Sequence, residues 1–109
     1  MPYTVKAVTK WADTALPANE QMAKLTALSK HDFVAGFDAA PVAALRHAAT
    51  ASGDMLARGA VLLPDSLELI TTTVWKSQVV YTAFAQNPAM VAYLAAMAAG
   101  GWDVAITPV

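Results

Sequence analysis

The 109-residue chain contains no cysteine. Without thiols it cannot form disulfides, thiolate metal sites or a cysteine nucleophile. The absence of cysteine does not indicate a cellular compartment. Charged residues are also scarce, at 14% of the chain, and the net charge of -1 offers no basic field of the kind that neutralises phosphates. We therefore expect no nucleic-acid partner, and the cytoplasm is the default location.

No charged residue occurs between Lys76 and Asp103, so a membrane-spanning helix has to be considered. Polar residues and Pro88 interrupt the first half of that span. The apolar run that remains, residues 89–99, is shorter than the ~20 residues that a spanning helix needs. The N-terminal residues show no long apolar core and no small-residue cleavage site. The sequence predicts a buried helix, no membrane span and no secretory signal.

Hydrophobic residues make up 57% of the chain. Its length is that of one domain, residues 1–109, with a single core. So high an apolar fraction with so few charges indicates more buried surface than one small monomer can hide. Oligomerisation is the simplest explanation.

The first half of the chain predicts a strand followed by a helical region. Apolar and polar residues alternate with period 2 over residues 3–11, which is typical of a half-buried strand. Apolar residues at helical spacing then predict a helix over residues 18–30. Residues 31–37 are interpreted as a buried connection. Asp38 is predicted to cap a second helix that stops at Gly53.

The second half begins with a predicted hairpin. Residues 55–63, MLARGAVLL, are apolar at nearly every position, which is typical of a strand covered on both faces. A turn at residues 64–66 leads back into a strand over residues 67–75. The two faces of that second strand carry Thr71, Thr73 and Trp75 on one side, and Ile70, Thr72 and Val74 on the other.

Capping signals mark the last helical region. Ser77 is predicted to cap one helix, and Asn87 followed by Pro88 restarts it, because Asn caps well and Pro suits the first helical position. Gly100 and Gly101 end this region, and residues 102–107 alternate as a final strand.

The resulting order, βαββαβ, is the split βαβ arrangement of the α+β ferredoxin-like fold, an antiparallel sheet with helices on one face. We expect Thr71, Thr73 and Trp75 to look toward the helices. The opposite sheet face needs a second cover, and the nearest available one is the same sheet of another subunit. The sequence therefore predicts a homodimer through the sheet face.

The run TVWKS followed by an aromatic-bearing helix, within residues 69–86, LITTTVWKSQVVYTAFAQ, resembles the antibiotic biosynthesis monooxygenase family, including its heme-degrading branch. The likeness covers roughly residues 55–107 and is carried mostly by Trp75, Lys76, Ser77, Tyr81 and Phe84. It implies a dimeric α+β barrel with a pocket between sheet and helices. In catalytic members it also implies oxygenation without a metal or flavin.

Little of the family's catalytic pattern carries over residue by residue. Trp75 matches the Trp of the heme-degrading branch, but the His expected on the following helix falls near Tyr93 or Leu94, and the first strand lacks the expected Asn. Heme degradation is therefore disfavoured, and we expect no cofactor and no metal. The resemblance instead favours a cofactor-independent monooxygenase-like protein that acts on or binds a small apolar aromatic or polyketide-like compound.

Candidate site residues are aromatic or titratable. The expected substrate-binding wall consists of Trp11, Trp75, Phe84 and Trp102. His47 is a candidate base because an ordinary His pKa of about 6.5 suits proton transfer near neutrality, and Tyr81 could donate a hydrogen bond to a substrate oxygen.

The structural alternatives are that His47 is a partly exposed helix residue, that Trp75 is a core anchor or dimer contact, and that His31 is a surface cap.

Two other functions stay open. The absence of a well-formed acid–base pair favours a non-catalytic small-molecule-binding or structural dimer. The opening Met1-Pro2 is similar to that of the tautomerase superfamily, in which removal of Met exposes the secondary amine of Pro2 as the general base, although the rest of the chain resembles that superfamily poorly. No phosphate loop, metal-ligand spacing or nucleotide fingerprint is present.

Overall fold

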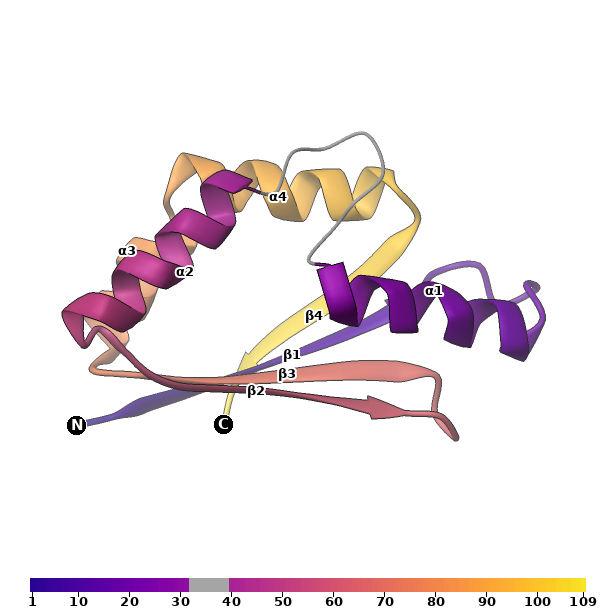
Figure 1. Ribbon diagram of the computed structural model, residues 1–109, viewed down its shortest axis with the longest axis horizontal. Coiled ribbons are helices and arrows are strands. Elements are labelled where there is room, and N and C mark those ends of the chain that lie inside the picture. The colour runs from indigo at the N-terminus through magenta and orange to yellow at the C-terminus, as the bar shows by residue number, and fades with distance from the viewer. Residues whose placement is uncertain (32–39) are drawn as a thin grey trace.

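A four-stranded antiparallel sheet carries helices on one of its faces (Figure 1). The structure is a computed structural model that describes residues 1–31 and 40–109, with only the backbone described at residues 30 and 31. The elements are β1 (Tyr3–Trp11), α1 (Ala18–His31), α2 (Ala40–Ser52), β2 (Met55–Leu63), β3 (Glu68–Trp75), α3 (Gln78–Ala85), α4 (Pro88–Ala99) and β4 (Trp102–Pro108). This matches the predicted βαββαβ order, with each helical region made of two helices.

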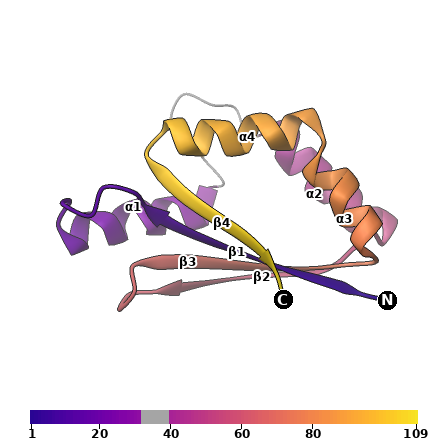
Figure 2. The same ribbon diagram turned by 180° about the vertical axis from the view of Figure 1, so that it is seen from behind.

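The strands lie in the order β2-β3-β1-β4, and every neighbouring pair is antiparallel. This is the ferredoxin-like topology that the sequence predicts. The register places Ala7 between Thr71 of β3 and Ile106 of β4 at the centre of the sheet. Seen from the front and from behind, the helices lie on the same side (Figures 1 and 2). The opposite sheet face is open in the single chain.

Two of the predicted capping residues, Ser77 and Asn87, are confirmed. Ser77 Oγ accepts a 3.3 Å hydrogen bond from the Val80 amide, and Asn87 Oδ1 accepts a 3.0 Å bond from the Ala89 amide. These bonds satisfy amide donors that a helix start leaves unpaired. Gly53 follows α2 at a φ of 82°, a left-handed conformation that glycine adopts without steric cost. In the described part of the chain, none of these helices is long and apolar enough to cross a membrane.

Two expectations about the hairpin are corrected. β3 begins at Glu68, one residue later than predicted, because Leu67 has a φ of 54° and belongs to the turn. β2 is the edge strand, and its side chains at positions 56–61 are exposed, so the expectation of cover on both faces is wrong for the single chain. The predicted connection at 31–37, beyond the backbone of residue 31, and the predicted cap at Asp38 lie outside the described residues.

The core is divided into two clusters between helices and sheet. The first cluster consists of Leu25, Leu28, Leu69 and Met97, and the second of Val5, Ala49, Met55 and Trp75. α1 covers one end of the sheet, α2 and α3 cover the other, and α4 runs above the space between them (Figure 1). Residues of both clusters line a cavity between the helices and the sheet.

Candidate functional site

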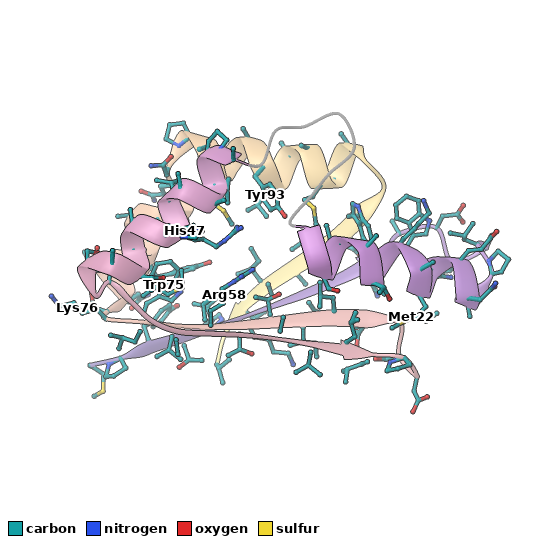
Figure 3. The ribbon with its side chains drawn as sticks, in the orientation of Figure 1. Met22, His47, Arg58, Trp75, Lys76 and Tyr93 are labelled. Carbon is teal, nitrogen blue, oxygen red and sulfur yellow. The ribbon has the colours of Figure 1, made fainter. Side chains whose placement is uncertain are left out.

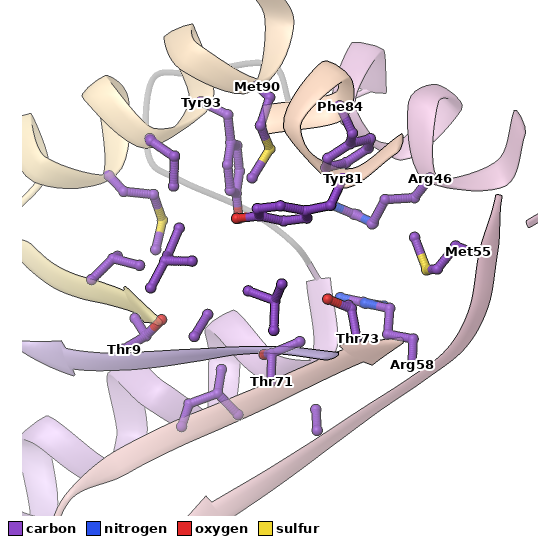
Figure 4. A pocket seen from close by; sticks show the side chains of 18 of the residues that line it. Thr9, Arg46, Met55, Arg58, Thr71, Thr73, Tyr81, Phe84, Met90 and Tyr93 are labelled. Carbon is purple, nitrogen blue, oxygen red and sulfur yellow. The ribbon is translucent and has the colours of Figure 1, made fainter. Parts of the chain in front are cut away.

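A cavity of about 140 Å³ lies between the sheet and the helices (Figure 4). Residues of every described helix and strand line it, and it touches both core clusters, through Leu69 and Met97 on one side and Val5 and Trp75 on the other. An apolar cavity of about 150 Å³ is large enough to bind benzene. A space of this volume fits one aromatic ring, and a larger ligand would have to extend out of the cavity.

Polar groups reach the cavity from both of its layers. Thr9, Thr71 and Thr73 extend from the sheet, while Tyr81 and Tyr93 extend from α3 and α4 (Figure 4). Aliphatic, methionine and aromatic side chains supply most of the remaining wall. A mostly apolar cavity with a few convergent hydroxyl groups is the usual make-up of a small-molecule site.

Trp75 is both a core anchor and a cavity wall. Its side chain is 2% exposed, and its ring centroid lies 5.5 Å from that of Tyr81 and 4.7 Å from that of Phe84. The indole Nε1–H donates a 2.8 Å hydrogen bond to Thr73 Oγ1. Thr71, Thr73 and Trp75 all line the cavity, so the prediction that this face of β3 looks toward the helices is confirmed.

Tyr81 is held in its neutral form at ordinary pH. Burial raises the pKa of its hydroxyl above 10.0, and the neighbouring Tyr3, with ring centroids 5.7 Å apart, adds a smaller increase. The neutral hydroxyl keeps its proton, so it is available as a hydrogen-bond donor on the cavity wall and is not a base.

Comparison with solved structures finds the same architecture in other bacterial proteins. The protein Rv0793 from Mycobacterium tuberculosis is 17% identical with a TM-score of 0.61, covering 100% of this chain and 93% of its own. A proposed antibiotic biosynthesis monooxygenase from Deinococcus radiodurans is 16% identical with a TM-score of 0.55, covering 97% and 89%. SnoaB from Streptomyces nogalater, a cofactor-independent oxygenase crystallised as a variant, is 8% identical with a TM-score of 0.57, covering 97% and 90%.

The chain has the fold of the antibiotic biosynthesis monooxygenases. The resemblance noted in residues 69–86 thus agrees with the three-dimensional structure. No protein-family model and no curated protein matches the sequence. At identities this low the structural similarity establishes the fold alone. Any function has to be argued from the side chains of this chain.

Within this monooxygenase-type fold, two of the predicted wall residues lie away from the cavity. Trp11 and Trp102 face each other across β1 and β4 and pack edge to face, with ring centroids 5.2 Å apart. Lys24 Nζ lies 4.3 Å from the centroid of the Trp11 ring, a cation–π contact. Neither indole is among the residues that line the cavity, whereas Trp75, Tyr81 and Phe84 are.

His47 lies outside the cavity as well. It is exposed on α2 and lines an outer groove, defined by Ala43, Arg46, His47, Thr50, Ala51, Met55, Leu56, Ala57 and Arg58. Figure 3 shows His47 on α2 and Arg58 on β2 on the same side of the molecule. Its role as a base stays a prediction. Pro2 is exposed and does not line the cavity, and the side chain of His31 lies outside the described residues.

The cavity residues that sequence reasoning missed include Arg46, Arg58, Met90 and Tyr93. Arg58 had a detectable signal, because it is the one charged residue in the run MLARGAVLL. Met90 and Tyr93 belong to an apolar helix on which no pattern separates cavity residues from core residues. Across residues 1–31 and 40–109, no group of three or more His, Cys, Asp or Glu side chains is placed to hold a metal ion.

Proposed function

We propose that the protein is a cofactor-independent monooxygenase that acts on a small phenol or quinol bound in the cavity. The observation that carries this proposal is the cavity itself, which fits one aromatic ring and has Trp75, Phe84 and Tyr81 in its wall. Further support comes from the fold shared with SnoaB, described as a cofactor-independent oxygenase. Apolar walls exclude water from the bound ring and so limit side reactions of reactive intermediates.

The proposed reaction needs no external reductant. Loss of the phenolic proton leaves an electron-rich ring whose para carbon forms a C–O bond with O₂. Cleavage of the O–O bond then leaves one oxygen on the ring and releases the other as water. For phenol the balance is C₆H₆O + O₂ → C₆H₄O₂ + H₂O, so the substrate supplies all four electrons that reduce O₂.

The side chains divide this work. Phe84 and Trp75 pack against the ring, and the neutral hydroxyl of Tyr81 donates a hydrogen bond to the substrate oxygen and orients it. The substrate proton leaves toward the outer groove, where the imidazole of His47 accepts it. Arg46 and Arg58 line both the cavity and the groove, so they stand along this route.

A homodimer that covers the open sheet face is part of the same proposal. That face presents Ile70 and Val74 of β3, with Val61 of the edge strand 57% exposed beside them. Two copies of this face would bury one another, as apolar surface of this kind requires.

Binding without turnover is the alternative that a specific observation favours. None of the described residues that line the cavity is His, Asp or Glu, so the cavity itself supplies no ordinary general base. The protein would then hold a small apolar ligand. Tautomerase activity through Pro2 stays the third hypothesis, and turnover of phenylenolpyruvate that is lost in Pro2→Ala is its test.

Oxygen uptake tests the proposal. Purified protein is incubated with a panel of phenols and quinols, O₂ consumption is followed with an electrode, and ¹⁸O₂ is used to trace the oxygen in the product. We expect uptake above the uncatalysed rate, one ¹⁸O atom in the quinone, and a large loss in Tyr81→Phe. Tyr3→Phe is the matched control outside the cavity. Ligand binding without any oxygen uptake across the panel would leave the binding function as the better reading.

A further inference from the structure

The chain has two arginines, and both line the cavity. Arg46 comes from α2 and Arg58 from β2, where Arg58 pairs in register with Thr73. Figure 4 shows the two guanidinium groups on the same side of the cavity, at the end where α2 faces the edge strand. Two positively charged side chains, one from α2 and one from β2, therefore border the same largely apolar cavity.

The surroundings make this end of the cavity attractive to an anion. The other described residues of the lining are uncharged, and most are apolar. Arg58 is exposed and Arg46 is half-buried, and both also line the outer groove. Charges at the boundary between apolar walls and water keep part of their hydration, while the low-dielectric walls concentrate their field on a ligand.

The shape of an anion matters as well as its charge, because an arginine recognises a carboxylate through two parallel N–H···O bonds. A carboxylate is also compact enough to follow a single ring into a space of about 140 Å³. We propose that the cavity binds a small aromatic carboxylate, with its ring against Trp75 and Phe84 and its carboxylate at Arg46 and Arg58. The aromatic part of this ligand rests on the proposed function. Taken together, the two proposals make the substrate a phenol that carries a carboxylate.

Benzoate and benzamide are matched probes for this assignment, because they have nearly the same shape and differ in charge. We expect titration calorimetry at low salt to give a dissociation constant at least about tenfold lower for benzoate than for benzamide. Raising the salt concentration should reduce that preference, because ions screen partly exposed charges. Equal affinities for the two probes would overturn the proposal. Tighter binding of phenyl phosphate than of benzoate would overturn the choice of a carboxylate.

Substitutions locate the binding site. Arg58→Gln and Arg46→Gln should each weaken benzoate binding about tenfold and leave benzamide binding unchanged, and Arg58→Lys should retain part of the affinity. Lys76→Gln removes the same charge from an exposed position outside the cavity and should change neither. Unfolding midpoints establish that each variant is folded. Unchanged benzoate affinity in folded Arg58→Gln and Arg46→Gln would place the anion elsewhere and defeat the proposal.

These measurements are independent of turnover. If benzoate binding depends on both arginines while no phenol or hydroxybenzoate consumes oxygen, the carboxylate assignment stands and the monooxygenase proposal fails. If neutral phenols are oxygenated and benzoate does not bind, the reverse holds.

Discussion

The indole Nε1–H of Trp75 donates a 2.8 Å hydrogen bond to Thr73 Oγ1, two residues earlier on the same face of β3. Both residues line the cavity, and the indole is almost completely buried. The only hydrogen-bond donor of the Trp75 side chain is therefore already bonded to a residue of the same strand. Trp75 can therefore offer a ligand only apolar contact, while hydrogen bonding is left to hydroxyl groups such as that of Tyr81.

Replacement of Thr73 by Val tests this relationship. The change keeps the shape of the side chain and leaves the buried indole N–H without its acceptor, so we expect a loss of about 1–3 kcal/mol in the free energy of unfolding. Thr72→Val is the matched control, because Thr72 lies on the opposite face of β3 and Val suits a strand. Urea denaturation of both variants gives the comparison. Equal stabilities would show that the hydrogen bond contributes nothing net.

The raised pKa of Tyr81 predicts a loss of stability at alkaline pH. Both folded and unfolded chains hold the proton below about pH 10, so the contribution of this group is complete there. Above that pH the unfolded chain releases the proton first, and stability falls until the pH passes the higher pKa of the folded state. Unfolding free energies measured from pH 8 upward should fall less steeply in Tyr81→Phe than in the wild type.

The aromatic neighbour of Tyr81 gives a second measurement. Burial is the main cause of the raised pKa, and Tyr3 is the smaller one. Ultraviolet titration of tyrosinate should therefore show a small decrease in the Tyr81 pKa in Tyr3→Phe, with the value still above its ordinary range. A complete return to that range would assign the shift to Tyr3 instead of burial.

Local patterns in the sequence were sufficient to predict most of the fold. Period-2 alternation in residues 3–11 and the caps at Ser77 and Asn87 act over a few residues, and each predicts its element directly. The boundary at Leu67 was missed because a positive φ at a leucine depends on how the turn closes. The identity of the side chain does not indicate that conformation. The exposure of β2 was missed because an apolar run has the same appearance at the edge of a sheet as at its centre.

The site was less accessible to sequence reasoning because its members are distant in the chain. Trp11, Trp75 and Trp102 are equivalent as sequence signals, yet the register pairs Trp11 with Trp102 at one end of the sheet and Trp75 with Tyr3 at the other. Strand periodicity assigns a residue to a face and does not say which end of that face is covered by which helix. The meeting of Arg46 with Arg58 likewise depends on how α2 packs against β2.

The proposed dimer predicts a specific effect of charge on the open sheet face. Ile70→Lys should convert a dimer into a folded monomer, because a buried, unpaired ammonium in the interface is costly. Val79→Lys is the control, since Val79 on α3 is 79% exposed on the helical side of the molecule. Sedimentation equilibrium measures the mass of each variant. A wild-type monomer at micromolar concentration, or a dimer that tolerates Lys at position 70, would exclude this interface.

Gly53 and Gly101, which both have positive φ, predict unequal costs of the same substitution. Ala at either position is strained by the left-handed backbone, by about 1–2 kcal/mol. A Cβ at Gly53 meets no atom within 4 Å, whereas one at Gly101 lies 2.6 Å from the Trp11 ring. That ring packs against Trp102 and Lys24, so moving it costs these contacts, and overpacking typically adds about 1–3 kcal/mol. Denaturation should therefore show Gly101→Ala to be clearly less stable than Gly53→Ala. Equal losses would mean that the Trp11 ring moves aside freely and does not secure this end of the sheet.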